Sequence, residues 1–126
     1  MNILLIEDDL TLNELITDYL KLNGNSVVSL EDGMNAIDTI DKTNFDLYII
    51  DINIPHINGL EIVKYIRQKD ISTPIIMITA SMELENFKTA YKNGCDDYIK
   101  KPFYLEELKI RIDKLLSKES NGNSLI

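Results

Sequence analysis

Four apolar segments of the sequence each end at polar residues that could take part in chemistry. Glu7 and Asp8 follow the first segment, and Asp51 directly follows a longer apolar run. Thr79 ends a third segment, and Lys101 follows a fourth. Carboxylates, a hydroxyl and an ammonium are groups that can hold a divalent cation and receive a phosphoryl group.

Short continuous apolar runs indicate strands that are buried on both faces of a parallel sheet. The predicted strands are residues 2–6, 26–30, 45–51, 75–79 and 98–99. Apolar residues recur at helical spacing in the segments 12–22, 34–40, 60–66, 82–93 and 105–116. A strand followed by a helix, repeated five times, predicts a single α/β domain with right-handed crossovers onto one parallel sheet.

The carboxyl ends of parallel strands meet at one edge of the sheet, where ligands usually bind. We therefore expect the polar residues above to lie together. Two unit charges about 4 Å apart cost about 4 kcal/mol at an effective dielectric of 20, so a cluster of acids favours a bound divalent cation. Oxygen ligands suit Mg²⁺ better than zinc, for which the sequence offers only His56 and Cys95.

A carboxylate beside a cation, an ammonium and a hydroxyl predicts phosphoryl transfer. Asp51 would be the nucleophile and would form an acyl phosphate, while Thr79 and Lys101 would contact the phosphoryl oxygens. Taken alone, Asp51 could also be a turn former or a helix cap. The other residues at the same edge favour the chemical interpretation.

Composition limits the other possibilities. The chain of 126 residues, 44% hydrophobic and 27% charged, fits one domain. A formal net charge of −8 argues against nucleic-acid or membrane binding by this domain itself. The sequence has one cysteine and no signal peptide, and no apolar run approaches the ~18 residues of a membrane span. These features predict a cytoplasmic protein. Residues 1–117 would form the domain, and 118–126 a polar tail or the start of a linker.

Four motifs carry a resemblance to a known family: ILLIEDD, DINIPHING, MITA and GCDDYIKKPF. Over residues 2–117 the chain resembles the receiver domains of two-component response regulators. The resemblance implies a flavodoxin-like fold with strand order 2-1-3-4-5. It also implies that Asp51 is phosphorylated by the phosphohistidine of a sensor histidine kinase.

The resemblance also implies a magnesium site. Glu7 and Asp8 would be the acidic pair, and Mg²⁺ would be bound by Asp8, Asp51 and the backbone carbonyl of Asn53. Glu7 stands where the family more often has Asp, so its longer side chain would reach the metal through water. The domain would assist its own phosphorylation and dephosphorylation without being a turnover enzyme.

Thr79 and Tyr98 match the switch pair of the family. The hydroxyl of Thr79 would be drawn toward the phosphoryl group, and the ring of Tyr98 would turn inward. Lys101 would pair with the phosphoryl group, and it precedes Pro102 across a bond that is usually cis in the family.

A finer resemblance is to the receivers of winged-helix transcription regulators of the OmpR/PhoB type. It implies a homodimer on phosphorylation through the fourth helix, fifth strand and fifth helix, with Asp97, Glu107 and Arg111 on that face. Phe87 stands where a basic residue is common. A DNA-binding effector domain, absent here, would then control transcription.

Two alternatives come from other functional classes. One is a stand-alone receiver or interaction module that signals without phosphorylation, although such domains tend to lose an acid, the Thr or the Lys. The other is a Mg²⁺-dependent phosphatase, which would carry its nucleophile after the first strand, whereas Asp51 follows the third.

Three further residues have simpler interpretations. His56 is expected to be an exposed loop residue, because no second metal ligand is spaced with it. Cys95 is expected to be a small buried hydrophobe. Asp9 precedes a helical pattern and is expected to cap that helix.

Overall fold

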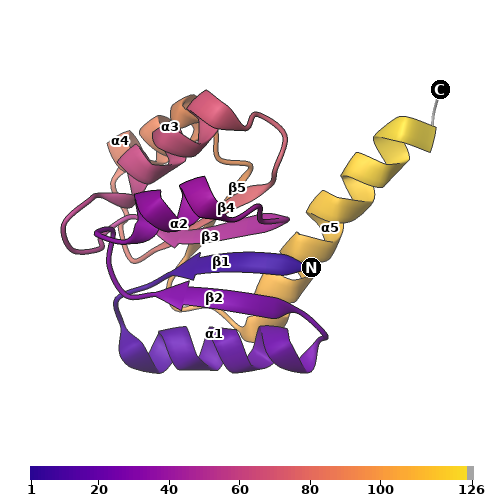
Figure 1. Cartoon of the computed structure of the whole chain (residues 1–126), viewed down its shortest axis with the longest axis horizontal. Helices are drawn as coiled ribbons and strands as arrows, with labels where there is room; N and C mark the ends of the chain where they lie inside the picture. The colour runs from indigo at the N-terminus through magenta and orange to yellow at the C-terminus, as the bar shows by residue number, and fades with distance from the viewer. Residues whose placement is uncertain (125–126) are drawn as a thin grey trace.

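Five parallel strands form one sheet in the order β2-β1-β3-β4-β5 (Figure 1). This computed structural model describes residues 1–124, and the side chains of residues 1–117. The strands are β1 (Asn2–Ile6), β2 (Ser26–Leu30), β3 (Leu47–Asp51), β4 (Ile75–Thr79) and β5 (Asp97–Lys100). The flavodoxin-like α/β fold expected from the sequence is confirmed.

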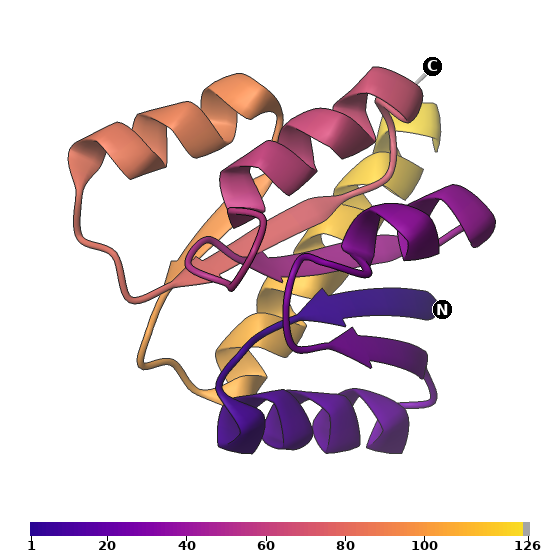
Figure 2. The same ribbon diagram turned by 60° about the vertical axis from the view of Figure 1, so that its left-hand side comes forward.

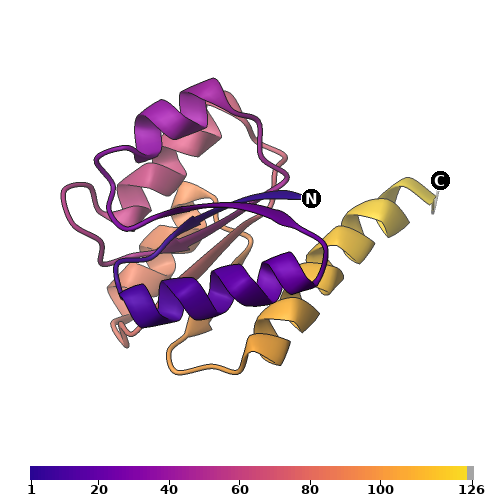
Figure 3. The same ribbon diagram turned by 60° about the horizontal axis from the view of Figure 1, so that its bottom comes forward.

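Helices cover both faces of the sheet. They are α1 (Leu10–Leu22), α2 (Ala36–Lys42), α3 (Gly59–Lys69), α4 (Leu84–Asn93) and α5 (Leu105–Ser124). Helices α1 and α5 lie on one face and α2, α3 and α4 on the other, as Figures 1 and 3 show from two directions. No helix in the described part of the chain is long and apolar enough to cross a membrane.

Two apolar layers, one on each side of the sheet, form the core. Successive strand residues point to opposite faces. In β1, Ile3 and Leu5 therefore pack with α1 and α5, while Leu4 and Ile6 pack with α2 and α3. This explains why the central strands are apolar without interruption. Burial of each such side chain contributes about 1.5–3 kcal/mol.

Specific residues fix where the helices begin and end. Asp9 is the N-cap of α1, as predicted, and its Oδ1 accepts a hydrogen bond from the N–H of Leu12 at 3.1 Å. Gly94 ends α4 in the left-handed conformation, with φ +112°. Asn58 caps α3 by accepting from the N–H of Leu60 at 2.7 Å. These local interactions set the ends of the helices by pairing or redirecting their terminal backbone groups.

Two predicted helix starts were wrong. Met34 lies before α2 and is 60% exposed. Its N–H donates to Asp32 Oδ1 at 2.8 Å in a turn that precedes the helix. Met82 lies before α4 and is 75% exposed. There the N–H of Glu83 donates to Ser81 Oγ at 3.3 Å, which forms a turn before the helix. Because of these side-chain to backbone hydrogen bonds, both helices begin two residues later than predicted.

The last helix extends beyond the predicted boundary. Its apolar pattern ends at Leu116, but α5 continues through Ser124. In an α-helix each backbone N–H bonds to the carbonyl four residues earlier, so the backbone stays paired beyond the apolar pattern. The division into a domain of residues 1–117 and a tail of 118–126 remains a prediction, and residues 125–126 lie outside the described part.

Candidate functional site

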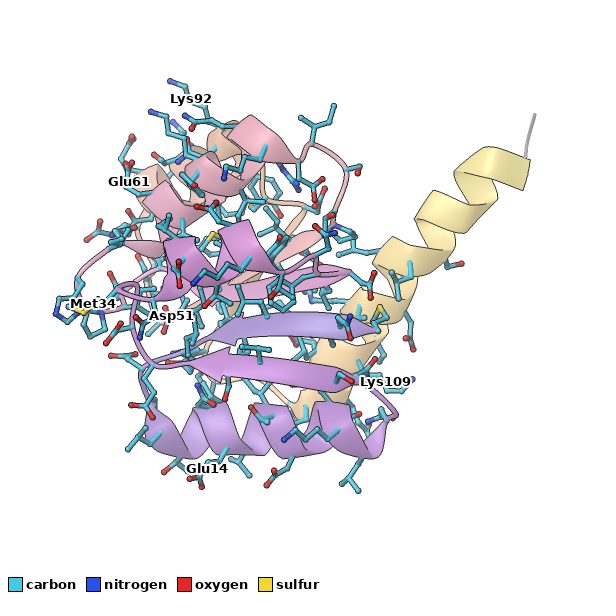
Figure 4. All side chains as sticks on the ribbon, viewed as in Figure 1. Glu14, Met34, Asp51, Glu61, Lys92 and Lys109 are labelled. Carbon is cyan, nitrogen blue, oxygen red and sulfur yellow. The ribbon has the colours of Figure 1, made fainter. Side chains whose placement is uncertain are left out.

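The polar residues that follow the strands gather at the carboxyl edge of the sheet. Asp51 is the last residue of β3, Figure 4 labels it on the side where the strand arrows end, and Figure 2 shows the loops that leave the strands on this side. Glu7 and Asp8 follow β1, Thr79 ends β4 and Lys101 follows β5. The parallel sheet brings them to one edge because all its strands run in one direction.

Lys101 joins two of the acids. Its Nζ lies 2.6 Å from Asp51 Oδ2 and 2.6 Å from Glu7 Oε1. Its backbone N–H donates to the carbonyl of Thr79 at 2.8 Å, and its peptide bond with Pro102 is cis, as the resemblance implied. Burial opposes the charge of Lys101, but the two carboxylates outweigh burial and raise its pKa.

Glu7 is completely buried. Its Oε2 accepts a hydrogen bond from the N–H of Asp9 at 3.0 Å. Burial raises the pKa of Glu7 from 4.5 to about 7, against the opposite effects of Lys101 and of the Asp9 N–H. This carboxyl group therefore gains and loses its proton near neutral pH.

Both carboxylate oxygens of Asp51 are held. The residue is 3% exposed, and while Oδ2 contacts Lys101, Oδ1 accepts from the N–H of Asn53 at 3.1 Å. Gly59, the first residue of α3, lies against the Asp51 backbone: a Cβ there would sit 2.1 Å from the Asp51 carbonyl oxygen. Only glycine fits this approach, so α3 and its loop help to fix Asp51.

The acidic residues fit a divalent cation. Carboxylate oxygens of Glu7, Asp8 and Asp51 all lie within 4.8 Å of one another. Asp8 is exposed, so water can complete the coordination of an ion there. An all-oxygen donor set with open positions suits Mg²⁺. Asn53 is in the loop directly after β3, where the resemblance places a carbonyl ligand.

The two residues of the predicted switch pair are both buried. Thr79 is 0% exposed, and its Oγ1 accepts from the N–H of Ser81 at 3.0 Å. Tyr98 is 8% exposed, and its ring packs edge-on against Phe87 with centroids 5.3 Å apart. Within the described residues its hydroxyl has no hydrogen-bond partner of good geometry. The ring of Tyr98 thus lies inward, and the role of the pair remains a prediction.

The residues expected on the dimer face pair within this chain. Arg111 Nη1 lies 2.8 Å from Asp97 Oδ1, and Arg111 Nε lies 3.8 Å from Glu107 Oε2. Ile110, beside them on α5, is 65% exposed. The face therefore presents charged and apolar groups together.

Two minor residues are placed as expected. The side chain of His56 is 52% exposed, and its Nδ1 lies 3.8 Å from Asp32 Oδ2. Its φ of 73° lies in the left-handed region. Cys95 is 6% exposed, and burial raises the pKa of its thiol to about 12, so the sulfur is unreactive.

Sequence reasoning did not identify three residues that hold the site and its surroundings: Asn13, Gly59 and Arg67. Asn13 is buried on α1, at helical spacing before the buried residues Ile16 and Leu20. That spacing was a usable signal, because it puts a polar side chain on the core face. The contacts of Gly59 and Arg67 had no comparable signal.

Comparison with known proteins agrees with this geometry. Residues 3–113 match the family described as the response regulator receiver domain. The chain is 37% identical over 123 residues to the transcriptional regulatory protein CiaR of Streptococcus pneumoniae, covering 98% of this chain and 54% of that protein. It is 41% identical over 124 residues to the response regulator ArlR of Staphylococcus epidermidis, covering 98% and 56%. The chain thus spans about half the length of these relatives.

Solved structures of receiver domains have the same fold as this chain. The receiver domain of the Francisella response regulator 1452 superposes with a TM-score of 0.84 at 32% identity, covering 94% of this chain and 98% of that one. A CheY-like receiver domain protein of Methanospirillum hungatei gives a TM-score of 0.89 at 26% identity, covering 95% and 97%. Relatives named as transcriptional regulators are consistent with the OmpR/PhoB type suggested by the sequence. The chain belongs to the family of response regulator receiver domains.

Proposed function

We propose that this receiver domain is a phosphoacceptor switch in which Asp51 takes a phosphoryl group from the phosphohistidine of a sensor histidine kinase. One observation carries the proposal: Asp51 is nearly buried, contacts the ammonium of Lys101 at 2.6 Å and lies in a cluster of acids. A buried carboxylate among groups that neutralise phosphate charge is suited to phosphoryl transfer.

The charges of the cluster match one Mg²⁺ ion. The carboxylates of Glu7, Asp8 and Asp51 and the ammonium of Lys101 leave two negative charges when all are ionised. Glu7, Asp8, Asp51 and the carbonyl of Asn53 would hold the ion, directly or through water. When bound, it supplies neutralisation of negative charge on the phosphoryl oxygens.

In the transfer step, a carboxylate oxygen of Asp51 forms a bond to phosphorus as the bond from phosphorus to the imidazole nitrogen of the donor breaks. The electron pair of that bond leaves with the imidazole. Lys101, which contacts Asp51 in the free domain, pairs with a phosphoryl oxygen in the product. Both residues are largely buried, so these electrostatic contacts are little screened by water.

Thr79 and Tyr98 would relay the change. Thr79 Oγ1 already accepts from the N–H of Ser81, which leaves its own proton free for a phosphoryl oxygen. Thr79 is followed by the loop that leads into α4, and Tyr98 packs against Phe87 of α4. A shift of Thr79 and this loop would therefore move α4 and change the surface that α4 presents.

The output would be transcription. The relatives are about twice as long as this chain, and those cited above are named as regulators of transcription or response regulators. Phosphorylation would favour a homodimer through α4, β5 and α5, with Asp97, Glu107 and Arg111 on its face. DNA would be contacted by an effector domain, since this domain carries a net charge of −8. Such a regulator would act in the cytoplasm.

Incubation with Mg²⁺ and acetyl phosphate tests the proposal. Intact-mass spectrometry should show one added phosphoryl group in the parent and none in Asp51→Asn, which keeps the shape but removes the nucleophile. Asp18→Asn, an exposed acid on α1, should label like the parent. Equal labelling of Asp51→Asn and the parent would refute the site. Absence of labelling in both would favour an interaction module that signals without phosphorylation.

A further inference from the structure

Asn13 lies on the buried face of α1 and contacts the turn that carries the acidic pair. It is 6% exposed. Its Nδ2 donates to the carbonyl of Glu7 at 3.0 Å and to the carbonyl of Leu30 at 3.2 Å. The hydroxyl of Thr17 donates to its Oδ1 at 3.3 Å. The amide thus uses both of its donors on backbone carbonyls at the ends of two strands.

The bond to Glu7 fixes the peptide that joins the two acids. A peptide unit is planar, so holding the carbonyl of Glu7 also sets the direction of the N–H and the Cα of Asp8. The backbone of Glu7 is held on its other side, because its own N–H donates to the carbonyl of Leu30 at 3.0 Å. Asn13 therefore controls the orientation from which the side chain of Asp8 starts.

Asp8 depends on this backbone support more than its neighbours do. The carboxylate of Glu7 is held by Lys101 and by the N–H of Asp9, and that of Asp51 by Lys101 and the N–H of Asn53. The side chain of Asp8 makes no hydrogen bond or ion pair with any residue whose side chain the structure describes. Yet one of its oxygens lies within 4.8 Å of those of Glu7 and Asp51. Its backbone is what keeps it there.

We propose that Asn13 is a positioning residue for the metal-binding carboxylates, holding the peptide between Glu7 and Asp8 so that Asp8 faces the cation site. This inference rests on the proposed function, because that function supplies the Mg²⁺ ion. Groups that orient metal ligands without touching the metal typically change metal affinity ~10–100-fold when they are mutated. A single bond to the backbone of a ligand belongs at the lower end, about 10-fold.

Calorimetric titration of the full chain with Mg²⁺ alone tests the inference. Asn13→Leu fills a similar volume but removes both donors, and it should weaken Mg²⁺ binding about 10-fold. Thr17→Val is the matched control: it removes the contact to Asn13 Oδ1 and keeps both bonds of Nδ2. It should bind Mg²⁺ like the parent. Circular dichroism would set a temperature at which all variants are folded, so that affinity is separated from stability.

The outcomes are distinguishable. Parent-like Mg²⁺ affinity in Asn13→Leu would overturn the role of Asn13 and leave the proposed function standing. An equal loss in Thr17→Val would also overturn it, since general packing of α1 would then be the cause. If Asn13→Leu does not fold, Asn13→Ala is titrated with the same expectation. A parent that does not bind Mg²⁺ would overturn the metal site and the role of Asn13 together.

Discussion

Glu7 and Asp51 share one ammonium group: the Nζ of Lys101 lies 2.6 Å from a carboxylate oxygen of each. One positive charge thus serves two buried acids, and the charge of Asp51 contributes to the raised pKa of Glu7, after burial itself. Without a metal ion the cluster is short of positive charge. Stability should therefore respond to pH and to the removal of either acid.

The first prediction concerns pH and Glu7→Gln. The folded pKa of Glu7, about 7, is above its ordinary value of 4.5, so between these values the folded state keeps a proton that the unfolded state has lost. The free energy of unfolding of the parent should therefore fall as pH rises through this window, by roughly 1–3 kcal/mol. The Gln side chain of Glu7→Gln does not titrate, so the free energy of unfolding of this variant should change less between these pH values. Urea unfolding with a chelator, at about pH 5 and about pH 7.5, measures the difference.

Asp18→Asn serves as the control, because this exposed acid should leave the slope unchanged. Hydrogen bonds from Thr73 and Ser72 outweigh burial and lower the pKa of Asp70 to about 2. Asp70 therefore adds to the free energy of unfolding above pH 3.8, the ordinary pKa of an aspartate, and this addition is lost as the pH falls toward 2. That range lies below the pH range in which Glu7 titrates, so Asp70 does not affect the comparison. A slope in Glu7→Gln equal to that of the parent would show that another group is responsible.

The second prediction is that Gly59→Ala damages the site. Its Cβ would lie 2.1 Å from the Asp51 carbonyl oxygen, so α3 or Asp51 must move, at a cost of about 1–3 kcal/mol in the free energy of unfolding. Mg²⁺ affinity measured by calorimetry should fall as well. Gly24→Ala is the control: φ there is +87°, and no heavy atom outside Gly24 and its two chain neighbours lies within 4 Å of an added Cβ. It should lose about 1–2 kcal/mol of stability and keep its Mg²⁺ affinity. Equal Mg²⁺ affinity in both variants would contradict the prediction.

The third prediction concerns Arg67, whose side chain is 14% exposed. It donates to the carbonyl of Gly94 at 2.9 Å, to the carbonyl of Asp70 at 2.9 Å and to Asp96 Oδ2 at 3.0 Å. Arg67→Met would remove all three of these bonds, leaving Asp96 Oδ2 with only the N–H of Ile75 at 2.8 Å, and should lower the free energy of unfolding by about 1–3 kcal/mol.

Urea unfolding measures this loss. Lys64→Met, on an exposed position of the same helix, should change stability by less than about 0.5 kcal/mol. Comparable losses in the two variants would mean that the three bonds of Arg67 add nothing specific.

The fourth prediction tests the dimer face. With Mg²⁺ and beryllium fluoride as a phosphoryl mimic, sedimentation should show the parent as a dimer. Ile110→Glu puts a charge on an α5 side chain that is 65% exposed, and it should remain a monomer. Leu22→Glu changes a residue that is 86% exposed on α1, outside the proposed face, and it should dimerise. Dimerisation of Ile110→Glu like the parent would exclude this face.

The sequence was sufficient for the architecture. Continuous apolar runs such as Ile75 to Ile78 predicted the central strands, because a strand covered on both faces is apolar along most of its length. The same runs placed Asp51 and Thr79 at strand ends, and parallel order then placed those ends at one edge. Two helix starts, near Met34 and Met82, were missed because side chains of Asp32 and Ser81 bond the backbone before each helix.

Only the tertiary structure decided how these residues meet. Lys101 holds Glu7 and Asp51 together, Gly59 lies against the Asp51 backbone, and Asn13 holds the carbonyl of Glu7. Periodicity shows which face of an element a residue occupies, but not which distant atom it touches there. Those contacts arise only when the strands align and the helices pack on the sheet, which brings the Nζ of Lys101 within 2.6 Å of Asp51, a residue 50 positions earlier in the chain.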